Sequence, residues 1–109
     1  MNWLYHFSWF FGGLFLANAA PHWISGITGR PFQTPFAKPP GEGLSSATVN
    51  VGWGIFNAAI GYILLFHVGH FRFRSMPDIA VCGLGALLIS LFSARHFSRF
   101  HGGDLSKRT

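Results

Sequence analysis

Residues 47–69 read ATVNVGWGIFNAAIGYILLFHVG, and this stretch decides the fold because it holds no charged side chain and is apolar or small on nearly every side of a helix. A helix rises about 1.5 Å per residue, so roughly twenty residues cross the ~30 Å hydrocarbon core of a bilayer. A water-exposed helix needs a polar face, which this stretch lacks. It therefore predicts a membrane-spanning helix, with Ser45 and Ser46 as N-cap candidates.

Two further stretches are free of Asp, Glu, Lys and Arg: one precedes Arg30 and the other is residues 79–94. The first predicts a helix over about residues 2–20, ending at Pro21, whose ring and missing N–H disfavour continuation. The second predicts a helix over about 78–95. It is short for a bilayer, and Arg95 is expected to snorkel to the headgroups and complete the crossing.

The expected fold class is an all-α integral membrane protein, a single domain over 1–109, with three transmembrane helices. Half of the residues are apolar and only 10% are charged. A very apolar soluble helical domain is the alternative. The N-terminal run also ends in Ala17-Asn18-Ala19, a small-x-small pattern that signal peptidase favours, but no Lys or Arg precedes the run. We interpret it as the first membrane helix.

Residues 21–46 form an unusual connection, with five prolines and four glycines among apolar side chains. It is too long for a simple turn and too apolar for a flexible linker, so we expect an ordered loop folded onto the helices or the membrane interface. A short helix at 22–28 fits within it. Arg30 and Lys38 are candidates for contact with a lipid phosphate or another anion, against the simpler interpretation that the glycines and prolines only shape a surface loop.

Lysine and arginine positions orient the predicted spans. The long loop and the basic tail, residues 96–109, would share one side of the membrane and hold six basic residues, against two on the other side. The positive-inside rule then predicts a cytoplasmic C-terminus and an N-terminus outside. The six basic residues are Arg30, Lys38, Arg95, Arg99, Lys107 and Arg108. They are scattered, so the net charge of +5 indicates anionic lipid rather than nucleic acid as the partner.

A stripe of small and amide residues follows one face of the 47–69 helix at intervals of four, three and four. Its members are Asn50, Gly54, Asn57 and Gly61. Such stripes allow close helix contact and interhelical hydrogen bonds in lipid. Packing within the chain is the simpler interpretation, and lining of the axis of a symmetric oligomer, as a pore or substrate path, is the alternative.

The predicted topology sorts the histidines into two groups at opposite ends of the helices. One group is His6, His67 and His70, and the second is His22, His96 and His101. Imidazole binds transition metals and haem iron, so the first group is a candidate metal or haem site. Interfacial hydrogen bonding is the simpler interpretation, because no Cys, Asp or Glu stands near this group in the sequence.

The sequence offers little for catalysis. No Asp or Glu lies inside a predicted span, which disfavours a proton-coupled exporter, and the serine–histidine pairs have no carboxylate close in sequence to orient them. We expect no catalytic residues. The functional hypothesis is a small membrane protein that self-associates or joins a membrane complex, with the 47–69 helix supplying the main contact. An oligomeric channel or carrier is a specific form of it, and a haem- or metal-binding protein is the alternative.

Overall fold

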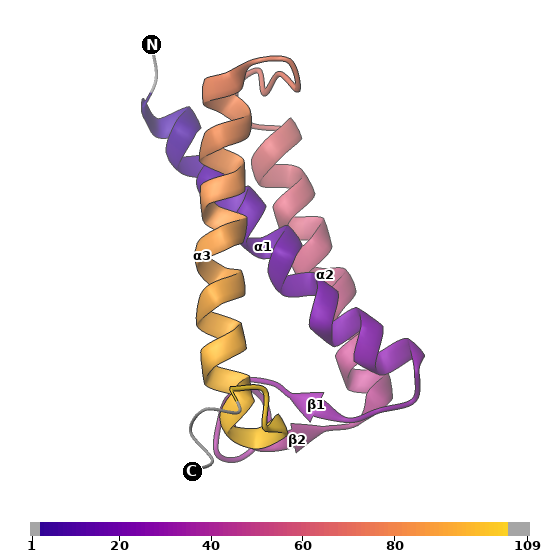
Figure 1. The fold of residues 1–109 in the computed structure, drawn as a ribbon. Helices are drawn as coiled ribbons and strands as arrows, with labels where there is room; N and C mark the ends of the chain where they lie inside the picture. The colour runs from indigo at the N-terminus through magenta and orange to yellow at the C-terminus, as the bar shows by residue number, and fades with distance from the viewer. Residues whose placement is uncertain (1–2, 105–109) are drawn as a thin grey trace.

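The computed structural model describes residues 3–104 as three helices and a short β-hairpin (Figure 1). The helices are α1 (Trp3–Ile27), α2 (Ala47–Phe66) and α3 (Met76–His101), and the strands β1 (Phe32–Gln33) and β2 (Leu44–Ser45) pair antiparallel. Helix α1 packs against both α2 and α3, whereas α2 and α3 have little contact with each other. The hairpin lies at the C-terminal end of α3.

Helix α1 does not end at Pro21, so that prediction is wrong. The proline lies inside the helix, and the residues that follow it, including the short helix allowed at 22–28, simply continue α1 to Ile27. Contacts with α2 explain the continuation, because His22 is hydrogen-bonded to Asn50 and a side chain at Gly26 would meet Val51. Packing after the proline compensates for the helical hydrogen bond that the proline removes.

The other two helices also differ from their predicted bounds. Helix α2 has the expected N-cap at Ser46 but ends at Phe66, before the left-handed Gly69. Helix α3 begins after the cap Ser75 and runs past Arg95 to His101, where left-handed Gly102 ends it. The predicted basic tail thus begins as helix. Residues 105–109, with Lys107 and Arg108, lie outside the described part of the chain.

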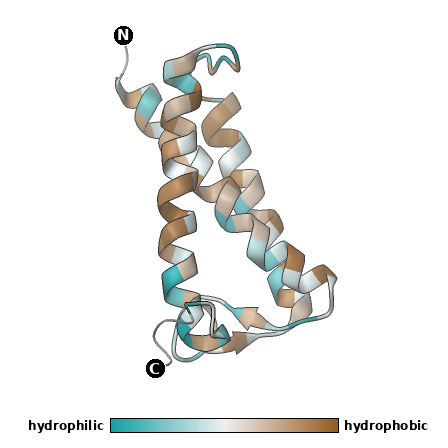
Figure 2. Cartoon of the chain, in the orientation of Figure 1, coloured by the Kyte–Doolittle hydropathy of each residue, from teal (hydrophilic) through white to brown (hydrophobic). Residues whose placement is uncertain are grey.

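The interior of the described chain is more polar than its surface. Buried hydrophobic residues are Trp9, Ala19 and Leu65, whereas the buried polar residues are His22, Gln33, Thr34, Asn50, Asn57 and Asp78. Large apolar side chains point outward along all three helices, for example Leu87 and Phe92 on α3. Figure 2 shows the hydrophobic middle of α3 between hydrophilic residues at its C-terminal end and in the loop that precedes it.

Two of the described helices, α2 and α3, are long and apolar enough to cross a membrane. In the most apolar 18-residue stretch of each, only 28% and 11% of the residues are buried within the chain. Helix α1 is longer than α2 but is not one of the two. Polar side chains such as Asn18 and His22 lower the mean hydropathy of α1, and both face its neighbours.

Glycines let α1 approach both neighbours closely. A Cβ atom at Gly61 of α2 would stand 2.9 Å from the Gly12 carbonyl oxygen of α1, and one at Gly54 would stand 2.8 Å from the Trp23 nitrogen. On the α3 side, a Cβ at Gly85 would overlap the Phe10 carbonyl oxygen. Small residues at such crossings bring backbones into van der Waals contact, which drives helix association when lipid is the solvent.

Candidate functional site

The predicted stripe on α2 faces α1 and is occupied within the chain. Asn50 and Asn57 have exposed fractions of 0% and 1%, and Gly54 and Gly61 are buried at the helix crossing. Lining an oligomer axis would therefore require α1 to move away from α2. The stripe is the contact surface between two helices of one chain, and any contact with another chain uses a different face.

Asn50 is the centre of a hydrogen-bond network that joins α1, α2 and the hairpin. Its side-chain nitrogen donates to the carbonyl oxygens of Phe32, Ser45 and Ser46 at 3.1–3.2 Å. These carbonyls fix the orientation of the amide, so its oxygen faces His22 Nδ1 at 2.8 Å and can only accept. His22 consequently carries a proton on Nδ1.

Asn57, two helical turns after Asn50, forms a second link between α2 and α1. Its side-chain nitrogen donates to the Trp53 carbonyl at 2.8 Å, and its oxygen accepts from the Asn18 side chain at 3.1 Å. Asn18 was not singled out from the sequence as a partner for Asn57. The signal that could have found it is its spacing of four residues from His22, which puts both side chains on one face of α1.

At the hairpin end, residues of α1, α2, α3 and the loop line an open pocket of about 360 Å³, which we call the loop-end pocket. Its lining includes Asn18, His22, Gln33, Trp53, Phe92 and His96. Outside the pocket lining, His101 stacks on Phe32 and contacts the Gln33 side-chain oxygen at 2.9 Å. All three histidines of the second group therefore lie in or beside this pocket.

His96 contacts a partner through each of its two ring nitrogens. Its Nε2 lies 2.7 Å from the Gly41 carbonyl oxygen, which can only accept, so this nitrogen carries the proton. Its Nδ1 lies 3.2 Å from Nη2 of Arg99, which can only donate. Both ring nitrogens are thus satisfied, and the ring ties the end of α3 to the loop.

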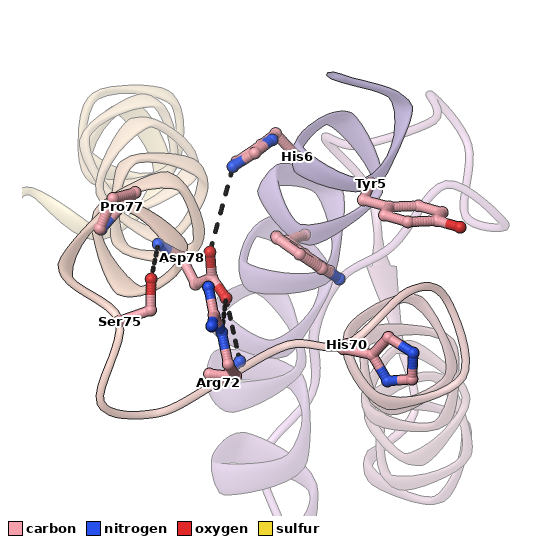
Figure 3. Close-up of a pocket in the computed structure, with 8 residues that line it drawn as sticks. Tyr5, His6, His70, Arg72, Ser75, Pro77 and Asp78 are labelled. Atoms are coloured by element: carbon pink, nitrogen blue, oxygen red, sulfur yellow. Dashed lines mark hydrogen bonds and ion pairs between the residues drawn. The ribbon is translucent and has the colours of Figure 1, made fainter. Parts of the chain in front are cut away.

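A second, open pocket of about 740 Å³ lies at the other end of the helices (Figure 3), and we call it the Asp78 pocket. The Asp78 carboxylate has a side-chain exposure of 5% and accepts from the Arg72 backbone N–H at 3.0 Å. It also lies 3.7 Å from Arg72 Nε and 4.0 Å from His6 Nε2. In Figure 3 this carboxylate stands between His6 and Arg72.

The fold brings to His6 an acidic residue that is distant in the sequence, because Asp78 comes within 4.0 Å of it. The acid was missed because 72 residues separate the pair, and only the crossing of α1 over the start of α3 joins them. His70 lines the same pocket, whereas His67 caps α2 and packs on Tyr62 at a centroid distance of 5.5 Å. Within residues 3–104, no three His, Cys, Asp or Glu side chains are grouped to hold a metal ion.

The candidate anion contacts lie on the loop surface. Arg30 follows the end of α1 and Lys38 lies in the turn between the strands, and both are exposed. Neither side chain lines the loop-end pocket.

Comparison of the chain with protein-family models, curated proteins and solved structures found no match. The functional interpretation therefore rests on the geometry of these two pockets and on the distribution of polar side chains.

Proposed function

We propose that the chain is an integral membrane protein whose three helices all cross the bilayer, with the N-terminus outside and the C-terminus in the cytoplasm. The observation that carries the proposal is the polar interior beneath an apolar surface. In water, exposed Leu84, Leu87 and Leu91 would cost free energy, whereas in lipid they are solvated and Asn50 and Asn57 are favoured inside.

Helix α1 crosses with the other two because its polar side chains are satisfied by α2. Asn18 and His22 bond to Asn57 and Asn50. Ser8 donates to the Leu64 carbonyl oxygen in α2 at 2.8 Å, and Trp9 donates to the Val68 carbonyl oxygen just after α2 at 2.9 Å. These bonds remove the cost of placing polar groups in hydrocarbon. The low mean hydropathy of α1 is therefore compatible with a membrane-spanning helix.

We further propose that the protein acts as a subunit of a membrane assembly, made either of its own copies or of other chains. Helix α3 supports this, because α1 is its one extensively packed helical neighbour within residues 3–104 and large apolar side chains in its middle, such as Leu84, Leu87 and Leu91, are exposed. The buried positions of Asn50 and Asn57 give no support to a pore on the α2 stripe, so the proposal does not include a channel.

The membrane proposal is tested by alkaline carbonate extraction of membranes from expressing cells and by reporter fusions to each end of the chain. We expect the protein in the carbonate-resistant pellet, with an N-terminal reporter outside and a C-terminal one inside. Release into the carbonate supernatant would overturn membrane insertion, and both reporters on one side would overturn three crossings.

The assembly is tested by measuring the mass of the protein in nanodiscs prepared directly from its membrane. We expect a mass above one chain, reduced by Leu87→Trp on the outer face of α3 and unchanged by the matched substitution Ile63→Trp on the outer face of α2. A single chain with no accompanying protein would overturn the assembly while leaving membrane insertion intact.

A further inference from the structure

The loop-end pocket has a polar floor with two unused hydrogen-bonding groups. His22 is 3% exposed, and with Nδ1 bound to Asn50 its Nε2 has no partner among residues 3–104 and can only accept when neutral. Gln33 is also 3% exposed, and with its oxygen at His101 its amide nitrogen has no partner in the same range and can only donate. Both residues line the cavity.

Neither group is sealed away from a ligand. Within the described chain, no fully enclosed side-chain nitrogen or oxygen lacks a partner, so both nitrogens keep some exposed surface, and both residues line the pocket. Water can bond to such groups when the pocket is empty, so a ligand gains affinity only if it replaces those hydrogen bonds. A molecule that donates to His22 and accepts from Gln33 would satisfy both.

The charge of the lining selects a neutral molecule. The residues that line the pocket include no Asp, Glu, Lys or Arg. A carboxylate or phosphate placed here would lose its water without gaining a counter-charge. An uncharged head group that combines a hydroxyl with a carbonyl group loses less hydration free energy on entering the pocket than a carboxylate or phosphate does.

Part of the wall is aromatic. Trp53, Phe92 and Phe97 line it, and Phe92 is 60% exposed. These side chains offer apolar surface against which a hydrocarbon chain can pack. The cavity volume is near the lower end of the roughly 300–1,000 Å³ of small-molecule sites.

We infer that the loop-end pocket binds one neutral, hydroxyl-headed lipid, with its head at His22 and Gln33 and its chain against Trp53 and Phe92. This site needs a single chain and does not depend on the proposed assembly. It relies on the proposed membrane location only for the supply of lipid.

The test uses full-length protein in detergent and monoolein whose acyl chain carries two bromine atoms, which quench tryptophan on contact. Trp53 is the tryptophan that lines the pocket, so we expect saturable quenching that unbrominated monoolein reverses. Trp53→Phe should remove the saturable part. Trp23→Phe, which changes an exposed tryptophan, is the matched control and should retain it. Saturable quenching that survives Trp53→Phe would overturn the site.

The polar floor is tested with Gln33→Met, which keeps the volume and removes the donor. We expect at least a tenfold weaker affinity for the brominated monoolein, with helicity unchanged by circular dichroism. Native mass spectrometry of the unaltered protein provides a test that needs no variant. It should show one bound monoolein per chain and at least tenfold weaker binding of oleate. Equal binding of the two lipids, or monoolein binding without a fixed stoichiometry, would contradict a neutral-headed site.

Discussion

Helix α1 holds its two neighbours by different means. Towards α2 and the residues just after it, α1 combines glycine crossings with hydrogen bonds, from the partly buried ones of Ser8 and Trp9 near its start to the buried one of His22 near its end. Towards α3 the crossing is a close backbone contact at Gly13 and Gly85, and the polar contact between the two helices within residues 3–104 is that of His6 with Asp78 at the start of α3. The difference teaches that polar bonds fix the α1–α2 register, whereas shape alone fixes the middle of α1–α3.

Asn50→Leu is the substitution expected to weaken the contact between α1 and α2 most. The substitution leaves the His22 Nδ1–H without an acceptor and removes the donor to three carbonyl oxygens. We expect the free energy of unfolding to fall by about 3 kcal/mol, since each stranded buried group costs on the order of 1 kcal/mol or more. Unfolding by sodium dodecyl sulfate in mixed micelles, followed by circular dichroism, measures it. A loss below about 1 kcal/mol would remove Asn50 from the centre of the network.

The α1–α3 side is broken by Gly85→Ala, because the new methyl group would overlap the Phe10 carbonyl. We expect a loss of about 2 kcal/mol from overpacking. Gly83→Ala is the matched control, since a Cβ there meets nothing within 4 Å. It should leave stability unchanged or raise it by up to about 1 kcal/mol through helix propensity. Equal effects of the two substitutions in the same assay would contradict the close crossing.

Asn57→Leu tests a single hydrogen bond of the α1–α2 contact, for comparison with the larger network around Asn50. It leaves the Asn18 amide without its acceptor, and we expect a loss of about 1 kcal/mol, the usual size for one interhelical hydrogen bond in a membrane. The mass in nanodiscs should not change, because Asn57 is 1% exposed. A change of mass with this substitution would show that α2 contacts another chain through this face.

The smallest effect is expected from Asp78→Asn at the start of α3. The amide oxygen can still accept from the Arg72 backbone, and the ion pair with Arg72 is weak because that side chain is 73% exposed. We expect less than about 0.5 kcal/mol of lost stability in the same unfolding assay. A loss comparable to that of Asn50→Leu would mean that charge, and not only shape, holds α3.

Local patterns in the sequence predicted much of the fold. The charge-free stretches indicated all three helices, and Ser46 indicated the cap of α2. Pro21 misled the boundary of α1, because its local preference against helix is outweighed by contacts of His22 and Gly26 with α2. Such contacts join residues far apart in the chain, so they cannot be predicted from the residues next to Pro21.

The candidate site was less predictable than the fold. Histidine spacing indicated that His22, His96 and His101 share an end of the bundle, but nothing local indicated that Gln33 or Thr34 would be buried beside them. Their burial follows from the fold of the 28–46 segment, in which Thr34 is linked to Ser45 and to Gly41 across the hairpin. The sequence predicted that Asp78 begins a helix, but it did not predict that Asp78 would lie next to His6.

The sequence by itself determined three apolar helices and the small, amide-bearing face of α2, because hydrophobic length and periodicity are local properties of the chain. Only the tertiary structure decided what that face contacts, that α2 and α3 stay largely apart, and which nitrogens of His22 and Gln33 remain unused. These outcomes depend on residues 28 to 68 positions apart in the chain. Their meeting is set by how α1 crosses its neighbours and by where the hairpin folds back.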